Sequence, residues 1–402
     1  MQLSHPYAFL NATASVIGKL KMSFISRGAT TVAALMIFAA LRPINSFSAE
    51  TIKIGFAAPL TGALANFGKG QQNGALLAVE DINKIGLMVD GKRVVLELDS
   101  QDDAADPRTA TQVAQRLVDD DVVAVVGHML SGTSIAASKI YSEASVAEIS
   151  PSATNPAFTT QGLKTTFRLV ATDLQQGPAL AEFAYQSLHA KTVAIVDDST
   201  AYGKGLADQF EKSAKATGLT VISHDAVNEH TTDFRAILTT IKGERAGVIM
   251  YAGADATGGP FAKQAAQLAI RSKIIGGDGI CSEKLPELAG PAVDNVTCSE
   301  AAMPVEKLPG GSAFLANFQK RFDEPIQLYA AQSYDAVHII VDAMKRAKSV
   351  ERAKLLAELP STAYEGVIGP IKFKPNGDIQ NSVVSLYSYK NGKKLFLEKL
   401  KN

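Results

Sequence analysis

The sequence predicts an α/β protein built on two parallel β-sheets, and three observations lead to this prediction. The chain has 402 residues, which is enough for two domains. Apolar residues make up 46% of it, close to the globular average, which excludes a disordered chain and a small disulfide-dense scaffold. Short apolar runs alternate with longer helical segments. Because these runs are nearly continuous in hydrophobicity, the sheets should be parallel and buried on both faces.

Individual elements follow from local patterns. Asp106 is a good N-cap residue and precedes Pro107, which predicts a helix over Pro107–Asp119. Apolar residues spaced by three and four predict a second helix over Tyr329–Ala347, with its apolar stripe in the core. Near the C-terminus, Lys390-Asn391-Gly392 lies between two apolar runs and predicts a hairpin. Six runs are expected to form strands: Ile52–Ala58, Val94–Leu98, Val122–Val126, Val193–Val196, Gly247–Tyr251 and Lys273–Gly276.

These units form two clusters along the chain. The first covers roughly 50–168 and the second 192–298. After residue 300 the pattern is mostly helical, with too few strands for a third α/β domain. We therefore expect this last region to return and pack on the first cluster.

The first 48 residues are expected to be a signal peptide. Residues 1–49 contain four basic side chains and no acidic one, and Gly28–Leu41 has fourteen residues without a charge. Spanning a bilayer takes about 20 apolar residues, so this run fits the core of a secretory signal better than a transmembrane helix. Ser46 and Ser48 supply the small residues that favour cleavage before Ala49. The alternative, a buried N-terminal helix, lacks a polar face at the helical period.

Export changes how the charges and the cysteines are interpreted. The chain has 40 basic and 40 acidic residues, and without the four basic residues of the leader 36 basic residues remain against 40 acidic, a charge of −4. We do not expect such a protein to bind nucleic acid, which requires a basic face. In an oxidising compartment, Cys281 and Cys298 most simply form one disulfide, and two free thiols are the alternative.

Motifs of known catalytic and cofactor sites are missing. The sequence has no Gly-x-Ser-x-Gly elbow, Walker A loop or His-Glu-x-x-His helix. In Gly68–Gly74 the third glycine of a dinucleotide fingerprint would fall at Asn73, so the spacing fails. The six histidines are scattered. We therefore expect no catalytic residue, no metal and no cofactor.

Hydroxyl-rich loops follow two of the expected strands. Val122–Val126 leads into Gly127–Ser134, and a strand over Ala147–Ser150 leads into Pro151–Pro156. Ligands in open α/β sheets bind at the carboxyl ends of the strands. Free N–H groups at a helix start, with serine or threonine hydroxyls beside them, form a site for a carboxylate. Ordinary capping could explain one such loop, but two in consecutive units favour a binding site.

Several motifs, in their order and spacing, resemble the periplasmic amino-acid binding proteins of the Leu/Ile/Val type. The resemblance covers nearly the whole chain after the leader. It rests on Ile54–Gly62 (IGFAAPLTG), Asp99–Pro107 (DSQDDAADP), Gly127–Ser134 (GHMLSGTS), Ser150–Pro156 (SPSATNP) and Ala201–Ala207 (AYGKGLA), with Gln175–Gly177 and Gly366–Pro370 in addition.

The resemblance implies the fold of a type I periplasmic binding protein, with two Rossmann-like lobes joined by a three-crossing hinge. Lobe 1 would comprise 49–169 and 300–378. Lobe 2 would comprise 170–299 and the C-terminal hairpin, 379–402. The implied function is capture of a free amino acid and its delivery to an ABC permease of the inner membrane, by a monomeric periplasmic protein and not by an enzyme.

Site residues also follow from the resemblance, position by position. In lobe 1, Ser131 and Thr154 would supply the hydroxyls that hold the α-carboxylate and the α-amino group. The backbone around Leu130, Ser152 and Ala153 would complete this frame.

Other expected ligand contacts lie on both lobes. Tyr202 would close over the zwitterionic head from lobe 2. Asp278 stands where the family keeps an acidic partner for the ammonium. Phe67 occupies an aromatic position beside the side-chain pocket.

Because of one departure from the family pattern, more than one class of ligand is possible. After Tyr251-Ala252-Gly253 the family often has an aromatic residue facing the ligand, and here Ala254 and Asp255 follow. The leading prediction is a branched-chain amino acid. One alternative is a receptor for amides, polar amino acids or small carboxylates. Another, from a different class, is an enzyme that uses Asp278 and His128, although no nucleophile–base pair can be recognised.

Overall fold

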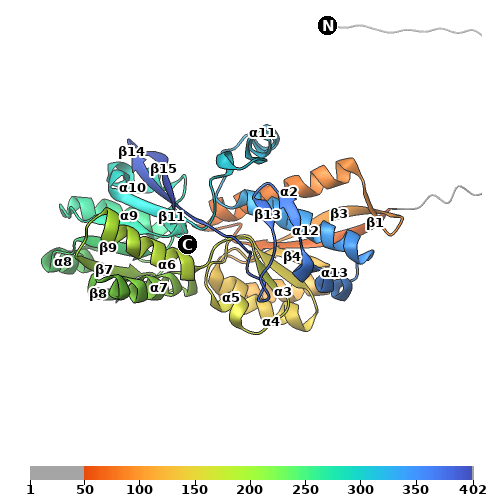
Figure 1. The fold of residues 1–402 in the computed structure, drawn as a ribbon, viewed down its shortest axis with the longest axis horizontal. Helices are drawn as coiled ribbons and strands as arrows, with labels where there is room; N and C mark the ends of the chain where they lie inside the picture. The colour runs from red at the N-terminus through yellow and green to blue at the C-terminus, as the bar shows by residue number, and fades with distance from the viewer. Residues whose placement is uncertain (1–48, 401–402) are drawn as a thin grey trace, which may run out of the picture. The chain divides into compact units, whose positions relative to one another are not determined.

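Two β-sheets, each covered by helices on both faces, form the body of the protein (Figure 1). The structure is a computed structural model that describes residues 49–400, so the predicted signal peptide over 1–48 lies outside the described residues. We call the part around the first sheet lobe 1 and the part around the second lobe 2. The predicted fold class, an α/β protein with two lobes and parallel-sheet cores, is confirmed.

Lobe 1 surrounds a six-stranded sheet. Its strands are β1 (Glu50–Ala58), β2 (Leu87–Val89), β3 (Lys92–Asp102), β4 (Ala124–Gly127), β5 (Ala147–Ser150) and β6 (Thr166–Arg168). They lie in the order β2-β3-β1-β4-β5-β6, and only the edge pair β2–β3 is antiparallel. Its helices are α2 (Ala65–Ile85), α3 (Pro107–Asp119), α4 (Ser131–Glu143), α5 (Ala157–Thr160), α11 (Gly311–Phe322), α12 (Ala330–Ala347) and α13 (Arg352–Glu358), and a separate short pair is formed by β12 (Tyr364–Gly366) and β13 (Gly369–Ile371).

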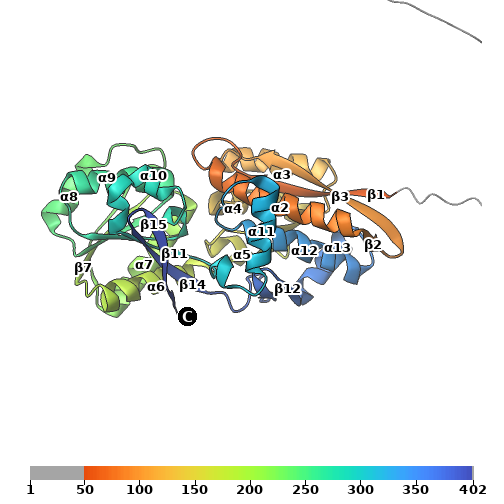
Figure 2. The ribbon, with the colours of Figure 1, turned by 90° about the horizontal axis from the view of Figure 1, so that it is seen from above.

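Lobe 2 surrounds a seven-stranded sheet. Its strands are β7 (Thr192–Asp197), β8 (Thr220–Ala226), β9 (Val248–Ala252), β10 (Lys273–Gly276), β11 (Val296–Glu300), β14 (Val384–Lys390) and β15 (Lys393–Leu400). They lie in the order β15-β14-β11-β10-β9-β7-β8, and the last two strands of the chain are antiparallel to their neighbours. Its helices are α6 (Asp173–Glu182), α7 (Ala201–Thr217), α8 (Arg235–Glu244), α9 (Asp255–Gln267) and α10 (Leu285–Ala289). Figure 2 shows α8, α9 and α10 gathered on one side of this sheet.

The continuous apolar runs form strands that are buried on both faces, as predicted. In β1, Ile54 and Phe56 join the core beneath α2 and α12, whereas Ala57 joins the core beneath α3 and α4. Successive side chains of a strand point to opposite faces, so a sheet between two helical layers needs apolar residues at consecutive positions. All residues of β4, β5 and β9 are accordingly buried.

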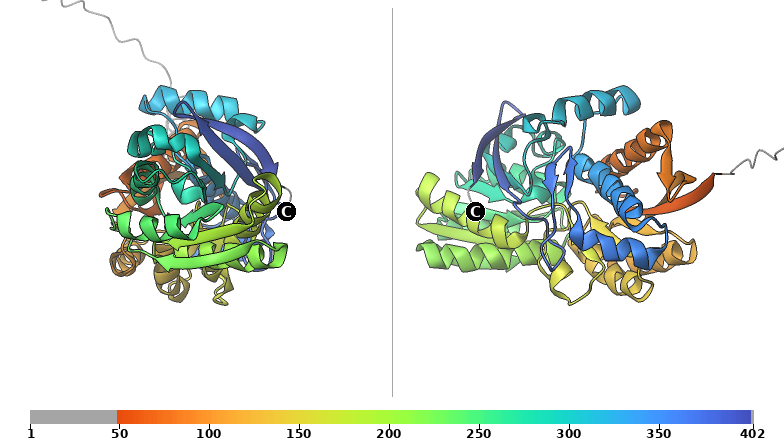
Figure 3. Two further views of the ribbon diagram at one scale, coloured as in Figure 1. Left: turned by 90° about the vertical axis from the view of Figure 1, so that its left-hand side faces the viewer. Right: turned by 45° about the vertical axis from the view of Figure 1, so that its right-hand side comes forward.

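The chain passes between the lobes three times: between β6 and α6, between β11 and α11, and between β13 and β14. After the second passage, α12 packs against lobe 1, and Val337, Val341 and Met344 of its predicted stripe lie in the lobe 1 core. After the third, the hairpin β14–β15 adds to the sheet of lobe 2 (Figure 3). Asn391 and Gly392 of its turn both have positive φ, as a tight hairpin turn requires.

Strong local patterns predicted element bounds well, and polar strands were missed. The structure gives β10 and α3 the predicted bounds, and α12 begins one residue later than expected. Among the strands that the apolar pattern does not predict are β8, an edge strand with half-buried residues, and β11, where polar side chains interrupt the pattern although all five residues are buried. Among the described helices, none is both long and apolar enough to cross a membrane.

The start of α3 provides a test of local stability. The Asp106 carboxylate accepts a hydrogen bond of 2.7 Å from the Thr109 N–H, and this bond lowers the pKa of Asp106. We expect Asp106→Ala to lower the free energy of unfolding by about 1 kcal/mol in urea titrations, because the cap is lost. Asp119→Ala, at the other end of the same helix, should leave stability unchanged or raise it, since an acidic residue there opposes the helix dipole. An equal loss in both variants would contradict the capping role.

The predicted disulfide is present. Cys281 and Cys298 are fully buried and bonded, with 5.3 Å between their Cα atoms. The bond ties the segment after β10 to β11, which lies beside β10 in the sheet. This segment also carries Asp278, so the disulfide restrains the loop that brings a predicted site residue into place.

Candidate functional site

A cavity of about 60 Å³ lies between the lobes, where strands of both sheets end. The carboxyl ends of parallel strands are the usual place for a ligand in such folds. Six of the eight predicted ligand-binding residues border it: Phe67, Leu130, Ser131, Ser152, Tyr202 and Asp278. The rest of its wall consists of Leu64, Gln71, Met129, Ala254, Gly279, Leu328 and Tyr329.

The lobe 1 side of the cavity is formed by the start of α4. Leu130 is extended, the helix begins at Ser131, and no side chain caps it. The first N–H groups of the helix are therefore without their usual side-chain acceptor. The Ser131 hydroxyl accepts a hydrogen bond from the Asn155 N–H at 3.2 Å, and the Ser152 hydroxyl donates to the Met129 carbonyl at 2.7 Å. These bonds hold the two hydroxyl loops together, and the resulting helix end can bind a carboxylate.

The other two predicted residues of lobe 1 lie behind this surface. Ala153 and Thr154 are fully buried and do not border the cavity. The Ala153 carbonyl accepts a hydrogen bond from Arg168. Burial raises the pKa of Asp173 to about 7, and the Thr154 hydroxyl acts in the opposite direction. The bond to Arg168 therefore holds the loop at Ala153, whereas the buried Thr154 hydroxyl has no hydrogen-bond partner among residues 49–400.

Asp278, which the resemblance implies as the partner of the ammonium, forms the acidic part of the cavity wall. It follows β10 and is only 5% exposed. The hydroxyls of Tyr202 and Tyr329 donate to its carboxylate at 2.9 and 2.8 Å, and the Gln176 amide donates at 3.1 Å. Burial raises the pKa of Asp278, and these three hydrogen bonds act against the increase. A carboxylate held in this way can receive an ammonium group.

Tyr202 connects α7 to the loop that carries Asp278. Thr200 caps the helix by accepting a hydrogen bond from the Gly203 N–H at 2.9 Å, which fixes its first turn. The Tyr202 hydroxyl also accepts a hydrogen bond of 2.8 Å from the Gly279 N–H. The ring therefore has a fixed position at the cavity wall.

Two residues that contact Asp278 were missed in the sequence. The sequence indicates Tyr329 only as the first residue of a core helix and Gln176 only as part of a family motif. Besides its bond to Asp278, the Tyr329 hydroxyl accepts a hydrogen bond of 3.0 Å from the Ala301 N–H. Both partners lie far from Asp278 along the chain, and no local pattern indicates their contact.

Ala254 and Asp255 stand where the chain departs from the family pattern, and only one of them borders the cavity. Ala254 lines it, whereas Asp255 does not. Asp255 is 1% exposed, and its carboxylate accepts a hydrogen bond of 2.5 Å from the Ser282 hydroxyl. Burial raises the pKa of Asp255 to about 6. Its carboxylate therefore bonds to Ser282 of lobe 2, lies near Asn66 of α2 in lobe 1, and does not border the ligand cavity.

His128, named in the enzyme alternative, is not brought to Asp278. It is fully buried in lobe 1 and does not border the cavity. Its ring nitrogens lie 2.8 Å from an Asp103 carboxylate oxygen and 3.0 Å from the Tyr141 hydroxyl. Within residues 49–400, no group of three or more His, Cys, Asp or Glu side chains is arranged to hold a metal ion.

Comparison with known proteins identifies the family. A family model described as periplasmic binding protein matches residues 51–394. The chain belongs to this family. The resemblance found in the sequence is thereby confirmed, and the family consists of substrate-binding receptors of the periplasm.

Relatives of this periplasmic binding protein include amino-acid receptors. A leucine-, isoleucine-, valine-, threonine- and alanine-binding protein of Pseudomonas aeruginosa is 32% identical, over 86% of this chain and 91% of that protein. A Leu/Ile/Val-binding protein of Rhizobium johnstonii is 34% identical, over 85% and 92%. Among solved structures, the branched-chain amino acid transporter substrate-binding protein of Streptococcus pneumoniae in complex with isoleucine is 31% identical, with a TM-score of 0.78 over 87% of this chain and 99% of that chain.

Proposed function

We propose that this periplasmic binding protein captures a free branched-chain amino acid, as a monomer, and delivers it to an ABC importer of the inner membrane. One observation carries the proposal: an uncapped helix start at Ser131 and a buried carboxylate at Asp278 border the same cavity. The first favours an anion and the second a cation. The head group of a free amino acid carries both charges.

In this proposal the α-carboxylate lies at the start of α4, against the hydroxyls of Ser131 and Ser152. The ammonium lies at Asp278, with Tyr202 beside it. Ala153 and Thr154 lie behind this surface, and the Ala153 carbonyl holds the loop in place through its bond to Arg168. A zwitterion that leaves water needs such fixed partners, because burial of a charge without them would abolish binding.

The side chain of the ligand is proposed to be aliphatic. The remaining wall of the cavity is largely apolar, with Leu64, Phe67, Met129 and Leu328. The small Ala254 leaves room at the position where an aromatic residue would narrow the pocket. Two relatives are named as binding proteins for leucine, isoleucine and valine, and this supports an aliphatic amino acid as the ligand.

Calorimetry with a panel of amino acids tests the proposal. We expect saturable binding of leucine, isoleucine or valine, and no binding of leucinamide or isocaproate, each of which lacks one charge of the zwitterion. Binding of amides, polar amino acids or small carboxylates in preference to aliphatic amino acids would favour the alternative receptor. A panel without any binding would contradict the proposed function.

We also propose that residues 1–48 are removed on export, that lobe 1 comprises 49–169 and 300–378, and that lobe 2 comprises 170–299 and 379–402. The periplasmic family supports export, and the sheet topology supports this division. The intact mass of the exported protein should correspond to a chain that begins at Ala49.

A further inference from the structure

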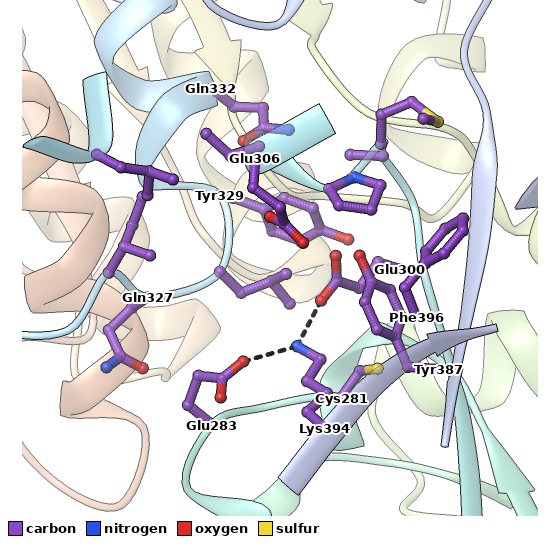
Figure 4. Close-up of a pocket in the computed structure, with 17 residues that line it drawn as sticks. Cys281, Glu283, Glu300, Glu306, Gln327, Tyr329, Gln332, Tyr387, Lys394 and Phe396 are labelled. Carbon is purple, nitrogen blue, oxygen red and sulfur yellow. Dashed lines mark hydrogen bonds and ion pairs between the residues drawn. The ribbon is translucent and has the colours of Figure 1, made fainter. Parts of the chain in front are cut away.

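A second, larger cavity lies next to the amino-acid pocket, and the proposed function does not use it. Its volume is about 180 Å³. Leu328 and Tyr329 border both cavities and so form the wall between them. Gln332 of α12 lies on its lobe 1 side, and the hairpin β14–β15 contributes Tyr387, Lys394 and Phe396 from lobe 2 (Figure 4).

The charged groups around this cavity are unbalanced. Three glutamates, Glu283, Glu300 and Glu306, border it together with one basic residue, Lys394. The Lys394 ammonium lies 2.6 Å from a Glu300 oxygen and 3.1 Å from a Glu283 oxygen, so these three side chains satisfy one another (Figure 4). Glu306 also borders the cavity; its side chain is exposed to solvent, and it has no ion pair or hydrogen bond among residues 49–400. Lys307 is not part of the wall, and its ammonium lies 4.5 Å from the centroid of the Phe396 ring.

An unpaired buried acceptor indicates what the cavity can hold. Gln332 is 3% exposed, and its side-chain oxygen has no hydrogen-bond partner in the part of the chain that the structure describes. A buried acceptor without a donor destabilises a folded protein, so a donor from a bound molecule would be favoured there. Gln332 and Glu306 border the same space (Figure 4).

The shape and lining restrict the ligand further. Apolar side chains such as Val305, Leu315 and Ile326 form part of the wall. Tyr387 and Phe396 add aromatic rings, and these rings already contact the ammonium groups of Lys394 and Lys307. A cavity of about 150 Å³ accommodates a molecule the size of benzene. The available space therefore suits an organic ion with a short carbon chain.

We propose that this cavity is a second binding site, for the protonated amino group of a small primary amine. The ammonium would donate hydrogen bonds to the Gln332 amide oxygen and the Glu306 carboxylate. The carbon chain would contact Val305, Leu315 and Ile326. This site does not depend on the identity of the amino-acid ligand, because the Leu328–Tyr329 wall separates the two cavities.

Calorimetry with n-butylamine at pH 7, in the absence of any amino acid, tests the proposal. We expect saturable binding of n-butylamine and none of n-butanol, which has the same length without the charge. Glu306→Gln and Gln332→Leu should each weaken amine binding by about tenfold to a hundredfold, the size expected for one lost hydrogen bond to a charged group. Glu287→Gln, a matched change on α10 outside the cavity, should leave the affinity unchanged.

Three results would overturn the second site. They are equal binding of n-butanol, unchanged amine affinity in both cavity variants, and displacement of the amine by leucine. Displacement would assign the amine to the first cavity at Asp278. Failure of leucine itself to bind would contradict only the proposed function, because the amine is measured alone.

Discussion

Asp278→Asn is expected to weaken amino-acid binding by about 2–4 kcal/mol, or about 30- to 1000-fold in Kd. The substitution keeps the size of the side chain and removes its charge. The amide oxygen of asparagine can still accept a hydrogen bond from the Tyr202 hydroxyl, and its amide N–H can donate to the Tyr329 hydroxyl, in place of the bonds of 2.9 and 2.8 Å to the two carboxylate oxygens. The fold should therefore persist, while the ammonium of the ligand loses its countercharge in a buried position.

Isothermal titration with leucine measures the loss, and Asp208→Asn serves as its control. Asp208 lies on α7 of the same lobe, is half-exposed, and pairs with Lys204 one helical turn away. An exposed pair of this kind contributes little to stability, so the control should bind as the unchanged protein does. Equal affinities of Asp278→Asn and the unchanged protein would remove Asp278 from the site.

The same carboxylate predicts how binding depends on pH. Burial raises the pKa of Asp278 in the free protein, and only the ionised form attracts an ammonium. At pH values above this raised pKa, leucine should bind with its full affinity. The affinity should decrease as the pH falls through the pKa. In Asp278→Asn the decrease should be absent, which separates this effect from acid unfolding.

Local patterns in the sequence were sufficient to predict the hydroxyl loops, but not to predict which side chains contact Asp278. The loops after β4 and β5 could be placed at one edge of the sheet because parallel strands end together. The contacts of Asp278 with Tyr329 and Gln176 span 51 and 102 positions, and they depend on how the lobes and the returning segment pack. Such contacts leave no periodic or spacing signal in a single sequence.

Arg168 is the strongest example of a residue without a sequence signal. It ends the three-residue strand β6, and its side chain is fully buried. Its guanidinium donates to the Asp378 carboxylate at 2.7 Å, to the Asn155 carbonyl at 2.9 Å and to the Thr159 hydroxyl at 2.8 Å, as well as to the Ala153 carbonyl. One side chain therefore ties the second hydroxyl loop to the segment that follows β13.

Arg168→Met is expected to lower the free energy of unfolding by about 3–5 kcal/mol, because it leaves the Asp378 carboxylate without its cation and two carbonyls without donors. Urea titration measures this loss. Arg235→Met is the matched control, since Arg235 is exposed and pairs with the exposed Asp233. No measurable change is expected there. A similar loss in both variants would mean that the effect of Arg168→Met does not come from burial of its partners.

A double variant separates stability from the position of the binding loop. Replacing a buried ion pair by apolar residues often restores stability, so Arg168→Met with Asp378→Leu should be more stable than Arg168→Met alone. The carbonyls of Ala153 and Asn155 remain without the donors that fix the loop, and Asn155 in turn bonds to Ser131 at the start of α4. The double variant should therefore remain about tenfold weaker than the unchanged protein in leucine binding, the size expected for one lost hydrogen bond to a charged group. Full recovery of affinity together with stability would show that the loop reaches its binding position without Arg168.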